Sequence, residues 1–383
     1  MENTIDYSVA LVKCESYEIR TLENLLIKLL SLLGGIGEFV KSGERVLVKT
    51  NLISGRPPEE AVTTHPSLVE AVVNLVQRAG GLPAIGDSPG ERATFTGLSR
   101  AYRTAGLEQV SSKTGAPLVR FEDEVMEIEN REGHFYKKFT VTKLLRDFDK
   151  IISVPKLKTH PLTYITAAVK NNLGFIPGLR KTELHLKLPD RESFSEMLLD
   201  LLGAVKIDLV ILDGVVAMEG NGPYSGSPRK VGAILASKNP VALDFVASRV
   251  VGYENPLEIP TNRIAVERGI FLPGKIEILG EKIEDLQVRD FRRIPQDFSQ
   301  KVPKFLLKWL KSLLSVRPRI VYESCDQCYT CLENCPVKCM ESRRDGRISI
   351  DYPNCIRCLC CQEFCPRGAI IAKKHWLVSL FTG

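Results

Sequence analysis

The residues with the strongest chemical signal are the cysteines near the end of the chain. Ten of the eleven cysteines lie between Cys325 and Cys365, and Cys14 is the remaining one. Disulfide-bonded secreted proteins spread their bridges over the whole chain or are very short. Thiols gathered in one segment of a 383-residue chain instead indicate bound metal in a reducing compartment.

The spacing of these cysteines indicates which metal group they bind. Eight of them form two copies of C-x2-C-x2-C-x3-C-P, in the segments CDQCYTCLENCP and CIRCLCCQEFCP. This is the spacing of bacterial ferredoxins with two [4Fe-4S] clusters, in which the fourth cysteine of each run binds the other cluster. Zinc sites use two C-x2-C pairs with a longer spacer, so zinc does not account for three cysteines in a row.

The spacing therefore predicts two ligand sets. The first cysteine set is Cys325, Cys328, Cys331 and Cys365. The second cysteine set is Cys355, Cys358, Cys361 and Cys335. We expect apolar side chains to exclude water from the clusters and so to tune their potential. The candidates for this role are Ile348, Ile350, Ile356, Leu359, Ile370 and Ile371.

Three cysteines fall outside these sets. We expect Cys339 and Cys360 to be small buried residues near the clusters, and the alternative for them is ligand exchange or redox sensing. Cys14 ends a strand-like run and is expected in the core.

The first 299 residues read as an α/β body. Short runs rich in β-branched residues predict buried strands, and stretches with 3.6-residue apolar spacing predict helices between them. The predicted strands are 7–14, 45–51, 82–87, 150–155, 207–214, 230–237 and 275–280. The predicted helices are 24–33, 67–81, 194–205 and 240–252. This alternation predicts a layered fold with a mainly parallel sheet.

Two segments depart from this alternation. Residues 117–141 alternate apolar and charged side chains around Glu132-Gly133, which predicts an antiparallel hairpin inserted in the body. Residues 300–319 hold six basic residues and no acid, with apolar residues at helical spacing. They predict an amphipathic linker helix ended by Pro318, and the alternative is a helix that binds a membrane surface or an acidic partner. Residues 320–375 then form the ferredoxin-like α+β domain.

Polar residues stand beyond the predicted strands of the body, where open α/β sheets form their clefts. Candidate catalytic residues are Lys158, His160 and Asp87. Candidate ligand-binding residues are Lys49, Asn51, His65, Lys156, Asn171, Asp213, Glu219, Asn221 and Arg229. Each alone has an ordinary alternative as a helix cap, a turn residue or a solvated charge. Together in one cleft they would suit an anionic or carbonyl-bearing substrate and a proton transfer.

Several segments carry a family resemblance. VKTNL, GDSPG, VPKLKTHPLTYITAAVKNNLG, DGVVAMEGNGPYSG and ASKNPVALDFVASRVVG resemble the family known as domain of unknown function 362. Members of that family often carry a C-terminal two-cluster ferredoxin module. The resemblance implies an iron–sulfur protein of the kind found in the redox metabolism of anaerobes, and it implies no particular reaction.

Composition, charge and the lack of certain motifs exclude several classes of protein. A net charge of +6 and 7% aromatic residues do not form the basic, aromatic surface typical of a nucleic-acid-binding protein. The N-terminus lacks a signal peptide and no apolar run reaches the ~20 residues of a transmembrane helix, so we expect a cytoplasmic protein. No nucleotide-binding glycine motif is present.

Two functions remain. The first is a ferredoxin-linked oxidoreductase, with a redox partner protein or low-potential electron donor and a small anionic substrate in the body. The second is a non-enzymatic electron-transfer or assembly subunit whose body docks a partner protein.

Overall fold

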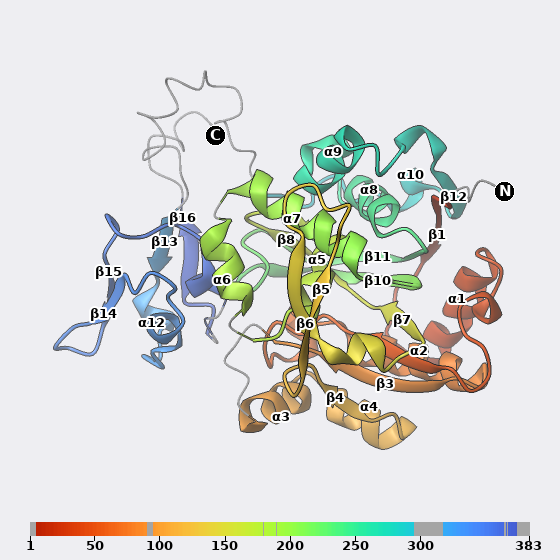
Figure 1. Cartoon of the computed structure of the whole chain (residues 1–383), viewed down its shortest axis with the longest axis horizontal. Coiled ribbons are helices and arrows are strands. Elements are labelled where there is room, and N and C mark those ends of the chain that lie inside the picture. The colour runs from red at the N-terminus through yellow and green to blue at the C-terminus, as the bar shows by residue number, and fades with distance from the viewer. Residues whose placement is uncertain are drawn as a thin grey trace.

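The computed structural model describes residues 5–89, 95–178, 180–188, 190–294, 317–363, 365 and 367–373. A ten-stranded sheet forms the centre of the body (Figure 1). Its strands are β1 (Ser8–Lys13), β2 (Arg45–Lys49), β3 (Leu82–Asp87), β4 (Leu118–Arg120), β7 (Lys150–Ser153), β8 (Lys156–His160), β9 (Tyr164–Thr166), β10 (Leu209–Glu219), β11 (Ser227–Ser237) and β12 (Glu277–Gly280).

The sheet is mainly parallel, as its apolar runs predict. The strand order is β12-β1-β11-β10-β7-β2-β3-β4, with β8 beside β10 and β9 beside β8. Only β11 and β9 pair antiparallel with their neighbours in this sheet. Both faces of the sheet are covered, because β10 alternates Val210 and Leu212 on one core cluster with Leu209 and Ile211 on the other.

Helices cover the two faces and make a three-layer α/β fold (Figure 1). One face packs against α1 (Ile19–Ser31), α2 (Pro66–Arg78), α3 (Phe95–Thr104) and α4 (Leu107–Thr114). The other face packs against α5 (Ala168–Asn171), α6 (Arg180–Lys187), α7 (Arg191–Ala204), α8 (Pro240–Val250), α9 (Pro260–Glu267) and α10 (Ile283–Leu286). The mainly parallel sheet and the four predicted helices are confirmed for the described residues.

The inserted hairpin is present but starts later than predicted. Strands β5 (Val125–Glu129) and β6 (Lys138–Thr142) pair antiparallel, and the turn between them contains Glu132-Gly133. Leu118–Arg120, which the prediction placed in the hairpin, instead pairs with β3 as the edge of the main sheet. Asp200 of α7 holds the hairpin turn by accepting backbone N–H bonds from His134, Phe135 and Tyr136 at 2.9, 2.7 and 2.7 Å.

Two strand ends of the prediction are corrected. Asp213 does not end its strand, because β10 continues to Glu219 with β11 paired along it. The segment after β7 is not a loop, since Lys156–His160 forms β8 and pairs with β10 from Asp213 to Met218. A register shift in β10 between Gly214 and Val216 accompanies this change of partner.

The C-terminal cysteine segment forms two small antiparallel pairs with two short helices. β13 (Arg317–Ile320) pairs with β16 (Ile370–Lys373), and β14 (Met340–Ser342) pairs with β15 (Ile348–Ile350). The helices are α12 (Thr330–Glu333) and α13 (Cys360–Glu363). Figure 1 shows this cysteine module, residues 317–373, at the left of the molecule and α1 at the right.

The predicted linker helix over 300–319 lies mostly outside the described residues. Its last three residues, 317–319, are described and belong to β13 rather than to a helix. Pro318 fits there because β13 has a partner on one side only in the described residues, so a missing N–H can face away from the ladder. No helix in the described part of the chain is long and apolar enough to cross a membrane.

Candidate functional site

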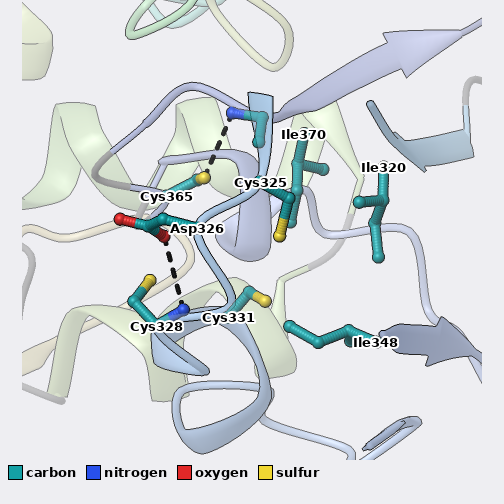
Figure 2. Close-up of a pocket in the computed structure, with 9 residues that line it drawn as sticks. Ile320, Cys325, Asp326, Cys328, Cys331, Ile348, Cys365 and Ile370 are labelled. Carbon is teal, nitrogen blue, oxygen red and sulfur yellow. Dashed lines mark hydrogen bonds between the residues drawn. The ribbon is translucent and has the colours of Figure 1, made fainter. Parts of the chain in front are cut away.

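The first cysteine set lines a single pocket (Figure 2). Cys325, Cys328 and Cys331 come from the first motif, and Cys365 comes from the second motif, across the module. Ile320, Ile348 and Ile370 form an apolar wall beside the thiols, and Ile348 and Ile370 were predicted in this role. Within the described chain, no three Cys, His, Asp or Glu side chains converge on the position of one metal ion. The four sulfurs instead stand around the pocket from different sides (Figure 2).

The backbone of the two motifs has the same unusual shape. Gln327 and Tyr329 in the first motif have φ of 57° and 58°, and Arg357 and Leu359 in the second have φ of 61° and 60°. A left-handed conformation costs a residue with a side chain about 1–2 kcal/mol. Such strain persists where a function requires the geometry. Here it gives the first three cysteines of both motifs the same backbone turn, and in the first motif these three cysteines line one pocket.

The second cysteine set is also gathered. Burial raises the pKa of Cys361 well above its ordinary value, and its neighbours Cys358, Cys331, Cys355 and Cys335 add to the increase. In the first set, burial and then the thiolates of Cys365 and Cys328 raise the pKa of Cys331 to about 12. Cys331 and Cys361 are therefore thiols at neutral pH without metal, and iron would supply the positive charge that converts them to thiolates.

The described hydrogen bonds to the cysteine sulfurs come from the module itself. The N–H of Ala369 donates to Sγ of Cys365 at 3.2 Å, and the hydroxyl of Thr330 donates to Sγ of Cys328 at 3.4 Å. Donors to thiolate sulfur raise the reduction potential of a cluster by stabilising its more negative form. A [4Fe-4S] cluster in this pocket would be tuned by these two groups.

The surplus cysteines are buried, in agreement with their expected place near the clusters. Cys339 is 6% exposed, and its sulfur lies 3.5 Å from that of Cys335. Cys360 is fully buried and packs with Cys358 and Ile356. Cys14 lies in the body core, where its thiol donates to the carbonyl of Ser16 at 3.3 Å.

In the body, one group of strand-end side chains forms what we call the Lys49 network: Lys49, Asn51, Asp87, Lys158 and Asn171. Nζ of Lys49 lies 2.9 Å from Oδ1 of Asp87 and 3.3 Å from Oδ1 of Asn171. Nδ2 of Asn51 donates to the same Asn171 oxygen at 3.0 Å. Nζ of Lys158 donates to Oδ1 of Asn51 at 2.6 Å and to the carbonyl of Val62 at 2.7 Å. The carboxyl edge of the sheet thus brings together five residues predicted from sequence.

The Lys49 network is closed to solvent in this structure. Its five side chains belong to residues that are at most 8% exposed. Gly174 presses against it, because a Cβ there would stand 2.3 Å from Oδ1 of Asp87 and 2.5 Å from Nζ of Lys49. Burial lowers the pKa of Lys49, and the Asp87 carboxylate works against that shift. The predicted open cleft is therefore a buried, hydrogen-bonded network among the described residues.

Lys156, Asp213 and His65 form a second group together with Tyr17, which we call the Tyr17 cluster. Nζ of Lys156 lies 2.9 Å from Oδ2 of Asp213 and 2.9 Å from the hydroxyl of Tyr17. That hydroxyl donates to Oδ1 of Asp213 at 2.6 Å. The rings of Tyr17 and His65 stack at a centroid distance of 3.6 Å. Burial raises the pKa of Tyr17 well above its ordinary value and lowers that of Lys156.

The two histidines of the prediction have structural contacts. Nδ1 of His65 accepts the N–H of Ser67 at 3.2 Å and caps α2, as a helix-opening residue should. Burial lowers the pKa of His65 to about 4. Nδ1 of His160 accepts the N–H groups of Leu162 and Thr163 at 3.1 and 3.3 Å. That nitrogen of His160 is therefore occupied in shaping the turn after β8.

The remaining three candidates lie outside both groups. The carboxylate of Glu219 accepts hydrogen bonds from the backbone N–H and from Nε of Arg292, at 2.9 and 2.8 Å. Arg229 pairs with Asp290, with both carboxylate oxygens at 2.6 Å. Asn221 faces the cysteine module, where Nε2 of Gln362 donates to its Oδ1 at 3.2 Å.

Sequence reasoning missed several members of these groups. Ser153, whose hydroxyl accepts from Nδ2 of Asn171 at 2.9 Å, stands at the end of β7 and had the same positional signal as Lys49. Lys181 of α6 donates to the carbonyls of Ser88 and Pro89, and burial lowers its pKa to about 8. Tyr17 lies 196 residues from Asp213 in the sequence, and only folding brings the two side chains together.

The chain has clear relatives by sequence. Residues 46–249 match the family described as a domain of unknown function, DUF362. A thylakoid-associated protein of Synechocystis sp. is 39% identical over 261 residues, which cover 66% of this chain and 77% of that protein.

Two solved structures show a weaker likeness. A Thermotoga maritima protein has a TM-score of 0.35, and the lactate racemase apoprotein of Thermoanaerobacterium thermosaccharolyticum has a TM-score of 0.39. Each is 13% identical to this chain in sequence. The match to the Thermotoga protein covers 58% of this chain and 56% of that protein, and the match to the racemase covers 63% of this chain and 57% of that protein. The family match spans more than half of the chain and the curated relative is closely similar over most of its length. This chain belongs to the DUF362 family.

Proposed function

We propose that the protein is an iron–sulfur redox protein that binds two [4Fe-4S] clusters for electron transfer. The first and second cysteine sets would each hold one cluster, and the clusters would supply one-electron chemistry at low potential. The observation that carries the proposal is that Cys365 of the second motif lines one pocket with Cys325, Cys328 and Cys331 of the first. The crossing of the fourth cysteine is the arrangement that the two-cluster spacing requires.

Metal analysis of anaerobically purified protein tests the cofactor. We expect about eight iron and eight sulfide per chain with a broad absorption near about 400 nm. Cys328→Ala and Cys358→Ala should each lower iron and sulfide to about half, while Cys14→Ala in the body core should leave both unchanged. Stoichiometric zinc without sulfide would overturn the proposal.

We further propose that the electrons serve an oxidoreductase reaction on an anionic or carbonyl-bearing substrate held by the body. Four buried lysines, Lys49, Lys156, Lys158 and Lys181, are gathered in the body with the carboxylates of Asp87, Asp213 and Glu122 nearby. Ammonium groups of this kind suit the binding of an anionic or carbonyl oxygen. Asn172, beside Asn171, is fully buried, and neither polar atom of its side chain has a partner among the described residues. A reducing compartment such as the cytoplasm would suit both the clusters and the free thiols.

A specific observation also favours the alternative, in which the body docks a partner protein and catalyses nothing. The Lys49 network and the Tyr17 cluster are held in internal hydrogen bonds, as in a scaffold. Reoxidation of the reduced protein by a panel of small α-keto acids, followed near about 400 nm, separates the two. Lys158→Met with full iron content should slow that reoxidation if the body is catalytic, and Lys13→Met, at the surface, should not. Equal rates in both variants would favour the docking subunit.

A further inference from the structure

The two cysteine motifs differ in what surrounds them. The first motif faces solvent, since Asp326, Gln327 and Cys328 are exposed. The second motif is more covered from Cys358 onward: Cys358 is 8% exposed where Cys328 is exposed, and Leu359, Cys360 and Gln362 are buried where Tyr329, Thr330 and Leu332 are partly exposed. Cys361 and its counterpart Cys331 are both buried. Two loops with the same cysteine spacing and the same backbone shape therefore differ in exposure at Cys328 and Cys358 and at the residues around the third cysteine.

The body supplies part of the cover over the second motif. Residues 219–226, EGNGPYSG, connect β10 to β11, and we call them the glycine-rich loop. Nε2 of Gln362, the residue after Cys361, donates to Oδ1 of Asn221 at 3.2 Å and to its carbonyl at 3.4 Å. Just beyond the motif, the hydroxyl of Ser225 donates to the carbonyl of Gly368 at 3.2 Å. The loop thus contacts Gln362 inside the second motif and Gly368 shortly after it.

The same loop also contacts the strand that carries Lys158. The N–H of Gly222 donates to the hydroxyl of Thr159 at 3.1 Å, and that hydroxyl donates to the carbonyl of Gly220 at 2.9 Å. A Cβ on Gly222 would stand 2.4 Å from the carbonyl oxygen of Thr159, so the contact requires glycine. Thr159 is bonded to Lys158, which holds Asn51 in the Lys49 network.

These contacts make one continuous route of covalent and hydrogen bonds. It runs from Cys361 through Gln362 to Asn221 and Gly222, and then through Thr159 to Lys158. Electron tunnelling decays less steeply along such bonds than through empty space. Among the described contacts of Asp326, Gln327 and Cys328, none reaches the body; Asp326, for example, pairs with Arg367 inside the module at 2.9 Å.

We propose that the second cysteine set holds the cluster that exchanges electrons with the body through the glycine-rich loop, and that the first set holds the cluster that meets external redox partners. This inference rests on the proposed function. In the forward direction the first cysteine set would hold the group that accepts one electron from a reduced one-electron carrier protein, and the second set would hold the group that passes it toward the carbonyl-bearing substrate of the body. No bond is made or broken and no proton moves in this transfer.

The experiment compares the solvent access of the two reduced clusters by electron paramagnetic resonance. Cys328→Ala and Cys358→Ala each disturb one set, which assigns the two signals of the wild-type protein. A water-soluble paramagnetic lanthanide chelate is then added to the reduced wild-type protein. The power needed to saturate the first-set signal should rise several-fold more than the power needed to saturate the second-set signal. Equal effects, or a larger effect on the second set, would overturn the inference.

A second measurement tests the loop without removing a ligand. Gln362→Ala and Asn221→Ala should each shift the midpoint potential or line shape of the second-set signal and leave the first-set signal unchanged. Ser342→Ala, on the exposed β14, is the matched control and should change neither. A loop variant that shifts only the first-set signal, or neither signal, contradicts the proposed role of the loop. Iron and sulfide counts separate failure of this inference from failure of the proposed function. The proposed function predicts two clusters per chain whichever cluster faces the body, so it fails only if the counts do not indicate two clusters.

Discussion

The ammonium nitrogen of Lys49 lies 2.9 Å from Oδ1 of Asp87, and the two side chains are 0% and 3% exposed. Desolvation of such a pair costs several kcal/mol per ion and is offset only when further hydrogen bonds complete it. Here the carbonyl of Thr50 and Oδ1 of Asn171 accept from the lysine, and the N–H of Leu52 donates to the carboxylate at 2.7 Å. The pair therefore fixes three chain segments at the carboxyl edge of the sheet.

Removal of one partner should leave the other buried and uncompensated. We expect Asp87→Asn to lower the free energy of unfolding by about 3–5 kcal/mol, measured by urea titration with far-ultraviolet circular dichroism. Glu15→Gln is the matched control, because it breaks the Lys13–Glu15 pair, whose side chains are 59% and 60% exposed. The control should be indistinguishable from wild type. Similar losses in both variants would show that the Lys49 pair is not the source of the effect.

Gly174 should not tolerate a side chain. A methyl group there overlaps Asp87 and Lys49, both of which are held by other bonds and cannot move away freely. We expect Gly174→Ala to destabilise the body by about 1–3 kcal/mol in the same titration. Gly274→Ala has nothing within 4 Å of the new Cβ and should have little effect. An unperturbed Gly174→Ala variant would mean that the network can open at small cost.

His65 should make stability depend on pH. Its pKa falls to about 4 in the folded protein from 6.5, with burial as the main cause. The folded state binds the proton less well than the unfolded state, so stability is full above pH 6.5 and declines as the pH falls toward 4. His65→Asn keeps a helix-capping side chain without the titration. Wild type should lose up to about 2 kcal/mol relative to His65→Asn between about pH 6.5 and about pH 5. Parallel curves for the two proteins would contradict this assignment.

Cys339 should be dispensable for iron although it lies beside a ligand candidate. The cysteine spacing assigns the iron bond to Cys335, and Cys339 lies outside both sets. Cys339→Ala should therefore retain iron and sulfide, while Cys335→Ala should lose about half of each. The two sulfurs lie 3.5 Å apart, so the two variants remove neighbouring thiols from nearly the same place. Loss of iron in Cys339→Ala equal to that in Cys335→Ala would reassign the ligand.

Some relations could be predicted because they depend on local spacing. Val9 and Leu11 alternate with Ala10 and Val12 on two core clusters, and short-range apolar pattern alone predicts such a buried strand. The hairpin turn at Glu132-Gly133 follows in the same way from local alternation and turn residues. Lys49 and Asp87 were predicted to be neighbours because both follow parallel strands, whose carboxyl ends share one edge.

Other relations depend on contacts between distant segments. Asp213 was expected at a strand end, but pairing with β11 extends β10 past it, and pairing cannot be read from one strand. Tyr17 reaches Asp213 across 196 residues, and Gln362 reaches Asn221 across 141. No local pattern marks either of these contacts.

The sequence by itself determined the α/β plan and predicts the cysteine sets, because apolar periodicity and ligand spacing are properties of neighbouring residues. Only the tertiary structure decided that the strand-end groups form a closed network and that the second motif faces the body. Burial is a property of the whole packed chain: the same cysteine spacing gives an exposed loop at Cys328 and a covered one at Cys358. Among the described residues, the glycine-rich loop bonds to Gln362 inside the second motif and to Gly368 just beyond it.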